Sequence, residues 1–196
     1  MTVKLNLGCG TRRLNGFVNV DISPVCKPDI TADLNRTPWP FQSNAADEVL
    51  LSHVLEHLGA DGDSFLRVMK ELYRVCADGA RIHIFVPHPR HDDFLIDPTH
   101  VRAILPETFL LFSKAKNREW ETRGAANTPL GLYLDVDFEV ARAAYILDEP
   151  WRSMREAGTL DEETLNRYIL TKNNIVKQVE VTLIVRKPPA VPNRPV

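Results

Sequence analysis

The stretch from Lys4 to Asp21, KLNLGCGTRRLNGFVNVD, constrains the fold of this chain more than any other. Alternating apolar residues lead into Gly8-Cys9-Gly10, and a second apolar run, residues 17–20, ends on the carboxylate of Asp21. This order predicts a strand, a glycine loop, a second strand and an acid. A glycine loop lets a ligand approach the backbone, whose free N–H groups can meet a polar group. An acid at the end of the neighbouring strand suits two adjacent ribose hydroxyls, so the stretch favours a nucleoside-containing ligand.

Composition narrows the class of protein. With 196 residues, 44% of them hydrophobic, the chain is most simply one domain around one core. The net charge of −2 offers no positive surface for a phosphate backbone, so we do not expect a nucleic-acid partner. No apolar run approaches the ~20 residues that span a bilayer, and there is no signal segment, so we expect a cytoplasmic protein without a membrane contact. Cys9, Cys26 and Cys76 lack a CxxC spacing and indicate reduced thiols. The oligomeric state stays open.

Two further segments extend the pattern. Residues 29–34, DITADL, place Asp33 after a short apolar run, and residues 47–58, DEVLLSHVLEHL, form a buried strand that leads into a short helix. With LNLGCG at the first strand and SHVLEHL after the fourth, the chain resembles the class I S-adenosylmethionine-dependent methyltransferases over roughly residues 3–112. The resemblance implies a single-domain Rossmann-like doubly wound α/β sheet, mostly parallel, with a closing antiparallel strand near the C-terminus. It implies S-adenosyl-L-methionine as cofactor and S-adenosyl-L-homocysteine as product. The wider family pattern has an acid where Asn6 stands and often a third glycine where Arg12 stands.

The resemblance also implies which residues bind the cofactor. Asp21 takes the ribose hydroxyls, Asp33 accepts a hydrogen bond from the adenine amino group, and the backbone N–H of Leu34 meets the ring. The alternative for Asp33 is a cap on the turn that follows. Ser52 and His53 reach the same edge because parallel strands end on one side of a sheet. The expected cofactor-binding residues are Leu7, Gly8, Cys9, Gly10, Asp21, Ile22, Asp33, Leu34, Ser52 and His53.

The remaining elements follow from spacing and periodicity. Only residues 11–16 separate the glycine loop from the second strand, so we expect a loop or single turn in place of the usual crossover helix. Four prolines within residues 22–46 exclude a long helix there. The pattern predicts helices over 63–77, 106–112 and 161–170, with Asp78-Gly79 as the stop of the first. It predicts a loop over 114–131 and strands at 81–86, within 133–147 and at 176–185, the last antiparallel.

Residues 53–57, HVLEH, match the H-x-x-E-H pattern of inverted zinc peptidases. Histidines at positions i and i+4 of a helix lie on one face, so His53 and His57 could share a metal. The motif directly follows a buried strand, and the resembling methyltransferases carry the same letters here without binding zinc. We therefore expect no metal.

Half of the six histidines fall within residues 88–100, immediately after a predicted central strand. The segment 88–102, HPRHDDFLIDPTHVR, has three interpretations: a metal site, a solvated loop, or a substrate loop that supplies an acid or base. We favour the last, because methyl transfer to oxygen or nitrogen is helped by removal of the acceptor's proton, and histidine titrates in the right range. His88 is the first candidate for the base, with His91, His100 and His53 behind it.

These observations predict a methyltransferase domain over residues 1–187, with 88–135 as a substrate-side insertion and 188–196 as a disordered proline-rich tail. Because only two residues precede the first strand, we expect residues 88–135 and the segment around Trp151 to select the acceptor. An insertion of this size suggests an oxygen or nitrogen acceptor on a small molecule, a sugar or a glycan. Two alternatives stay open. One is an NAD(P)-dependent oxidoreductase, although such enzymes normally show GxGxxG; the other is a non-catalytic module that binds S-adenosylmethionine.

Overall fold

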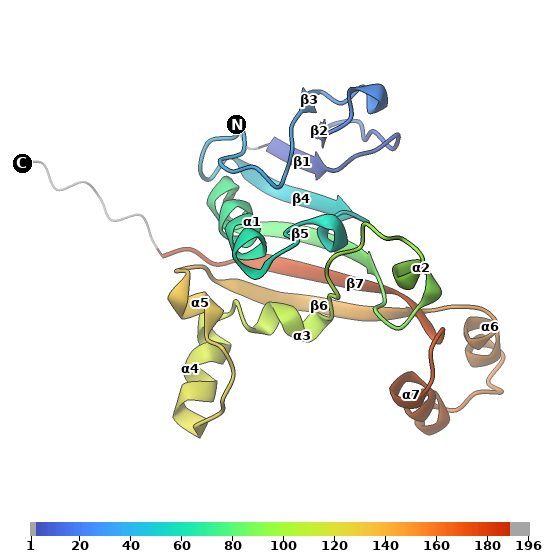
Figure 1. Cartoon of the computed structure of the whole chain (residues 1–196). Helices are drawn as coiled ribbons and strands as arrows, with labels where there is room; N and C mark the ends of the chain where they lie inside the picture. Colours follow the sequence, from blue (N-terminus) through green and yellow to red (C-terminus); the bar gives the residue numbers. More distant parts are fainter. Residues whose placement is uncertain (1–2, 189–196) are drawn as a thin grey trace, which may run out of the picture.

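Seven strands form one sheet in the order β3-β2-β1-β4-β5-β7-β6 in the computed structural model, which describes residues 3–188 (Figure 1). All neighbouring pairs are parallel except those of β7, which runs antiparallel to both β5 and β6. The predicted Rossmann-like sheet with a closing antiparallel strand is confirmed. The strands are β1 (Val3–Leu7), β2 (Val18–Asp21), β3 (Ile30–Thr31), β4 (Ala46–Ser52), β5 (Cys76–Pro87), β6 (Phe138–Leu147) and β7 (Val176–Val185).

The connection from β1 to β2 contains turns and no helix, as its length predicted. Two buried asparagines brace it. The side-chain amide of Asn6 donates to the carbonyl of Arg12 at 3.0 Å and to Oδ1 of Asn19 at 2.9 Å. The same Oδ1 accepts from the Leu14 N–H at 2.8 Å. Asn6 stands where the wider family pattern has an acid, and here its amide supplies the donors that fix a short crossover.

The proline-containing segment between β2 and β4 carries only the 3₁₀ turn η1 (Pro24–Cys26) and the short β3, as expected. Trp39 is buried in the core, and its indole N–H donates to the carbonyl of Leu34 at 3.0 Å. The aromatic residues of this segment therefore close the edge of the core.

Helix α1 (Gly62–Val75) begins at Asp61, whose side chain accepts from the Ser64 N–H. Its apolar face buries Phe65, Met69 and Leu72. The predicted end at Ala77 was two residues late, because Cys76 already pairs with Ala46 and begins β5. Asp78-Gly79 therefore lies inside the strand, next to a register shift in the β4–β5 pairing.

The predicted loop over residues 114–131 is wrong, because it contains α4 (Lys114–Arg123) and α5 (Leu130–Tyr133). The Ser113 side chain caps the start of α4, and Gly124, in the left-handed region, ends it. Only Asn117 of α4 is buried, so no apolar period marked the helix. The predicted helices at 106–112 and 161–170 are confirmed as α3 (Pro106–Leu110) and α7 (Glu162–Thr171), while α2 (Asp92–Leu95) and α6 (Trp151–Glu156) were not predicted.

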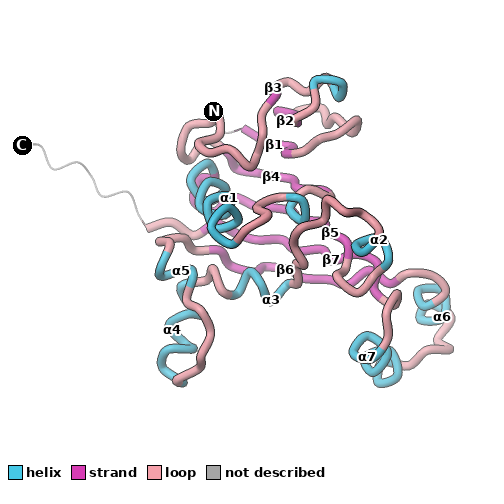
Figure 2. Tube along the Cα trace, in the orientation of Figure 1, coloured by secondary structure: helices cyan, strands magenta, loops and turns pink. Residues whose placement is uncertain are grey.

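The two faces of the sheet differ in burial. Helices α1 and α3 pack with Val49, Ile82 and Leu183 in one core, and Figure 2 shows these helices in front of the strands. Alternate residues that point to the opposite face, such as His83 and Thr182, are half-buried. Within residues 3–188, none of the helices has the length and the apolar composition that a membrane span requires. The predicted tail lies outside the described residues, apart from Pro188.

Candidate functional site

A cavity of about 360 Å³ opens at the carboxyl ends of β1, β2 and β4. The strand order reverses between β1 and β4, which is where ligands bind in open α/β sheets. The volume lies in the range of small-ligand sites. The structure brings together seven of the predicted cofactor residues and adds five others. The lining residues are Gly8, Gly10, Asp21, Ile22, Ala32, Asp33, Leu34, Asn35, His53, Val54, His57 and Leu58.

The two glycines of the loop have different roles. Gly8 has a φ of +68°, and a Cβ built there would lie 2.4 Å from Cγ2 of Val54. Gly10 has a φ of +51°, and its Cβ would meet nothing within 4 Å. Packing therefore requires the first glycine, while the second keeps space open at the cavity. The expectation that the loop presents free N–H groups is wrong for two of them, because the Cys9 N–H donates to Val20 and the Gly10 N–H to Asp21.

The carboxylate of Asp21 is fixed at the cavity by backbone donors. Oδ2 accepts from the Gly10 N–H and Oδ1 from the Ser23 N–H, both at 2.8 Å. A carboxylate has about four acceptor positions, so two bonds leave room for two more. The geometry holds an acceptor pair ready for two hydroxyl groups.

The next acid, Asp33, caps its turn, as the alternative interpretation stated. Its Oδ1 accepts from the Asn35 N–H at 2.9 Å, and Oδ2 lies 3.3 Å from Nε of Arg36. The side chain also lines the cavity, so capping and ligand binding are compatible. Asn35 was not predicted. Its Oδ1 accepts from the Gly59 N–H at 2.8 Å, a contact between distant segments that no local pattern announces.

Three predicted cofactor residues do not line this cavity. Leu7 is fully buried in the core, and Cys9 is 5% exposed, with burial raising the pKa of its thiol. Ser52 pairs with Phe85 and faces a second cavity of about 450 Å³. That second cavity lies beside the half-buried face of the sheet and is lined by Arg12, Leu14, Leu50, Ser52, His53, His83, Phe85 and Gln178.

His53 forms part of the wall of both cavities. Its φ of +56° is unusual for a residue with a side chain, and such strain often marks a functional position. Nε2 lies 3.1 Å from Oε1 of Gln178, and Nδ1 lies 3.5 Å from Oε1 of Glu56. The Glu56 carboxylate raises the pKa of His53, against the opposing effect of burial. The ring of His53 therefore lies between the carboxylate of Glu56 and the side-chain amide of Gln178.

His88 lies elsewhere, in the wall of a third cavity of about 660 Å³ that also contains Tyr145 and Glu107. It is 4% exposed, and its Nδ1 accepts from the Arg90 N–H at 3.2 Å. Burial, followed by the charge of Arg90, lowers the pKa of His88. The side chain does not line the first cavity, so the structure separates it from the predicted cofactor residues.

His91 has partners at both ring nitrogens. Nδ1 accepts from the Asp93 N–H at 3.0 Å, which assigns the proton to Nε2, and Nε2 then donates to Oδ2 of Asp148 at 3.0 Å. The ring is 4% exposed. This contact joins the segment after β5 to the end of β6, which is a structural use of the ring.

The His91–Asp148 contact predicts a pH dependence of stability. The bond from His91 holds the pKa of Asp148 below 3.8, so its stabilisation is present above that value and is lost as pH falls through the lower folded pKa. We expect Asp148→Asn to unfold about 1 kcal/mol more easily than wild type at pH 6, with the difference disappearing as pH falls through the lowered folded pKa of Asp148. Urea unfolding of both proteins across this range measures it. A difference that stays constant with pH would contradict the assignment.

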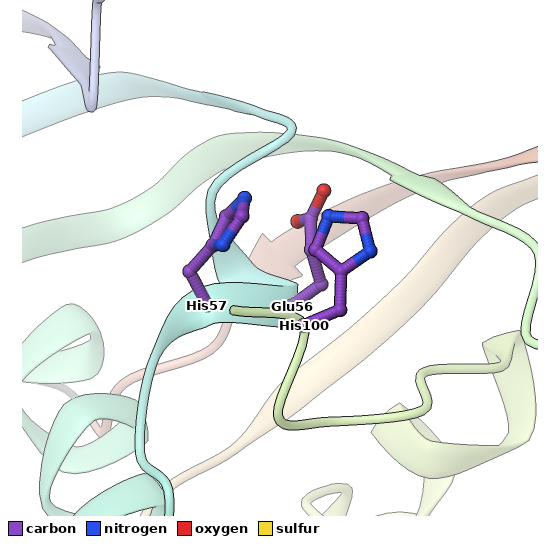
Figure 3. Close-up of side chains that lie close together, drawn as sticks. All are labelled: Glu56, His57 and His100. Carbon is purple, nitrogen blue, oxygen red and sulfur yellow. The ribbon is translucent and has the colours of Figure 1, made fainter. Parts of the chain in front are cut away.

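The segment after α2 folds back on the 3₁₀ turn η2 (Leu55–His57). The carbonyl of Glu56 accepts from the N–H groups of Val101 and Arg102, and the rings of His57 and His100 lie 4.6 Å apart (Figure 3). The prediction that the short helix includes His53 is wrong, because η2 begins only at Leu55, so His53 and His57 do not share a helix face. The structure pairs His57 with His100 instead.

Comparison with known proteins adds to this geometry. Residues 5–84 match the family model of a methyltransferase domain, and no curated protein matches the chain. Among solved structures, a SAM-dependent methyltransferase from Archaeoglobus fulgidus is 18% identical with a TM-score of 0.58, the match covering 93% of this chain and 86% of that one. A putative S-adenosylmethionine-dependent methyltransferase from Listeria monocytogenes is 14% identical with a TM-score of 0.52, and the match covers 95% of this chain and 90% of that one. The [4+2]-cyclase SpnF is 15% identical with a TM-score of 0.53, and the match covers 95% of this chain and 76% of that one. At these identities the likeness shows the fold.

Proposed function

We propose that the protein is an S-adenosylmethionine-dependent methyltransferase that transfers a methyl group to an oxygen or nitrogen of a small molecule, sugar or glycan, a proposal supported by the match of residues 5–84 to a methyltransferase domain. The observation that carries the proposal is the first cavity, where the glycine loop, Asp21 and Asp33 meet at the reversal of strand order. S-adenosyl-L-methionine is the cofactor, and when bound it supplies an electrophilic methyl group. We further propose that the protein acts in the cytoplasm, a location that suits its free thiols.

In this proposal the chain aligns the acceptor and takes its proton. Asp21 and Asp33 would hold the ribose and the adenine of the cofactor at the first cavity, and its methyl group would then be available to the acceptor atom. We assign the proton to the imidazole of His53, because this residue lines the cofactor cavity and the second cavity together. The Glu56 carboxylate beside Nδ1 would orient the ring and stabilise its protonated form. His88 becomes the second candidate because it faces the third cavity.

Acceptor selection is assigned to two groups of residues. The second cavity, beside Ser52 and His53, provides space next to the assigned base. Residues 97–102, part of the predicted insertion 88–135, lie against η2 and close to the first cavity. The remainder of the insertion contributes to the third cavity through His88 and Glu107.

Ligand-dependent thermal unfolding separates the proposal from a nicotinamide-dependent oxidoreductase. We expect S-adenosyl-L-homocysteine to raise Tm in a concentration-dependent way, since a ligand that binds only the folded state stabilises it. NAD and NADP should leave Tm unchanged. Protection by NAD without protection by S-adenosyl-L-homocysteine would overturn the cofactor assignment.

Turnover distinguishes an enzyme from a module that only binds the cofactor, and it is needed because SpnF carries this fold and its name states a cyclase activity. Acceptors are screened by release of S-adenosyl-L-homocysteine. With an acceptor that reacts, we expect His53→Ala to lower kcat by roughly 10²- to 10⁴-fold, the contribution typical of a general base. His88→Ala tests the second candidate, and we expect it to lower kcat much less than His53→Ala does. Full turnover by His53→Ala would remove His53 from this role.

A further inference from the structure

Glu56 is a buried carboxylate that lacks ordinary partners. Its residue is 0% exposed, and neither carboxylate oxygen has a hydrogen-bond partner among residues 3–188. The nearest donor, Nδ1 of His53, lies 3.5 Å from Oε1, outside the usual range for a hydrogen bond. An isolated buried charge is costly, so buried carboxylates are normally paired or bound to a metal. A cation bound beside the Glu56 carboxylate would offset the cost of burying its charge.

Two imidazoles stand beside this carboxylate. One ligand atom from each of Glu56, His57 and His100 can be chosen so that all three lie within 4.8 Å of one another, and Figure 3 shows the three side chains side by side. They come from η2 and from the segment that folds back on it. The three residues are separated from the glycine loop in sequence, yet His57 also lines the cofactor cavity.

The two histidines are already oriented by other contacts. Nδ1 of His100 lies 2.9 Å from the carbonyl of Phe94, and Nδ1 of His57 lies 3.2 Å from the carbonyl of Thr99. The Thr99 hydroxyl, 3.0 Å from the same Nδ1, donates its own hydrogen to Asp97 and so accepts from His57. A carbonyl accepts only, so each Nδ1 carries the proton and each Nε2 keeps its lone pair. Histidines that bind metals usually have this arrangement, in which the second nitrogen donates to a carbonyl or carboxylate. The contact of His100 Nε2 with Asp97, at 3.7 Å, is too long to compete as a hydrogen bond.

We propose that Glu56, His57 and His100 bind one divalent transition-metal ion, with Zn²⁺ as the reference ion. Two imidazoles and one carboxylate suit zinc and similar ions, and three protein ligands leave a position open, as in catalytic zinc sites. Ligands at 2.0–2.2 Å from a tetrahedral ion lie roughly 3.4 Å apart, so binding requires ligand atoms now up to 4.8 Å apart to approach one another by up to about 1.4 Å. This proposal departs from the sequence-based expectation of no metal.

The position of the site gives the ion a use that rests on the proposed function. His57 is shared with the cofactor cavity, so an acceptor hydroxyl or amine bound at the open position would lie beside that cavity. Metal binding itself does not depend on this role.

The test is calorimetric titration of Zn²⁺ into tag-free protein treated with a chelator, with Co²⁺ absorption as a second readout of coordination. We expect one ion per chain for wild type and an affinity at least roughly 100-fold lower for His57→Ala and His100→Ala, since even loss of a group that supports a ligand costs 10- to 100-fold. His83→Ala is the matched control. His83 is half-buried on the other face of the sheet, 3.9 Å from Glu48, and its replacement should leave Zn²⁺ affinity unchanged.

Glu56→Gln separates a ligand from a residue needed for folding. In metal-free protein this variant should be at least as stable as wild type, because it removes a buried carboxylate whose oxygens have no hydrogen-bond partner, and it should lose the rise in Tm that Zn²⁺ gives wild type. Equal Zn²⁺ affinity in wild type and His100→Ala, or no stoichiometric binding, would overturn the proposal. S-adenosyl-L-homocysteine titrations on the same samples keep the two proposals apart: binding without Zn²⁺ binding rejects only the metal site, and the reverse rejects only the proposed function.

Discussion

Replacing Asp21 by alanine is expected to lower the affinity for S-adenosyl-L-homocysteine by roughly 100-fold or more. The carboxylate is held at the cavity by the N–H groups of Gly10 and Ser23, and we propose that its remaining acceptor positions take two ribose hydroxyls. Hydrogen bonds to charged groups contribute about 1.5–3 kcal/mol each, and two of them correspond to at least a 100-fold change in Kd. Isothermal titration calorimetry of wild type and variant measures the change directly.

The matched control is Asp29→Ala. Asp29 is also a carboxylate bound to backbone, since it accepts from the Asn19 N–H at 2.8 Å, but it does not line the cavity. Its removal should reduce stability while S-adenosyl-L-homocysteine affinity stays within about threefold of wild type. Circular dichroism confirms that both variants are folded. Equal heats from wild type and Asp21→Ala would show that the nucleoside does not bind at this acid.

Gly59→Ala is expected to be the most destabilising small substitution near the site, by about 3 kcal/mol or more. The φ of Gly59 is +67°, and a Cβ there would lie 2.4 Å from Cα and 2.5 Å from N of Phe65. These are backbone atoms of α1, so no side-chain rotation relieves the overlap. The N–H of Gly59 also donates to Asn35 of the cavity, and its carbonyl accepts from Arg102. Weaker S-adenosyl-L-homocysteine binding should accompany the loss of stability.

Gly62→Ala provides the comparison only three positions away. Gly62 is the first residue of α1, and its Cβ would meet nothing within 4 Å. Alanine reduces the freedom of the unfolded chain without strain, so we expect a gain of about 0.4–1 kcal/mol. Urea unfolding of the two variants measures both effects. Similar stabilities for Gly59→Ala and Gly62→Ala would refute the steric argument.

The parts of the fold that the sequence predicted depend on local patterns. The strands around the glycine loop, helix α1 and the last strand each have a clear period, bounded by glycine or a capping acid. Helix α4 has neither a buried stripe nor a compact apolar run, so its sequence looked like a loop. Its caps, Ser113 and Gly124, were the only local signal.

The residues of the candidate site also divide into those that a local pattern predicted and those that only distant contacts bring to the cavity. Gly8, Gly10 and Asp21 were identified because the two strands and their loop are contiguous, and the structure places all three at one cavity. Asn35 and His57 were missed as lining residues because their places depend on contacts with the loop after η2 and with residues 97–102. The calorimetric titration of Asp21→Ala with S-adenosyl-L-homocysteine tests whether these residues bind the cofactor.

The sequence by itself determined the class of fold and the edge of the sheet at which Gly8, Gly10 and Asp21 meet, since both follow from the order of strands, glycines and acids along the chain. Only the tertiary structure decided the partners of the histidines. Four histidines look alike in the sequence but have different surroundings in the structure. His53 lies in the wall of the first cavity and His88 in the wall of the third, while His91 donates to Asp148 and His100 lies beside Glu56. The physical reason is that partners of side chains far apart in sequence are set by how segments fold back on the sheet, which no local period encodes.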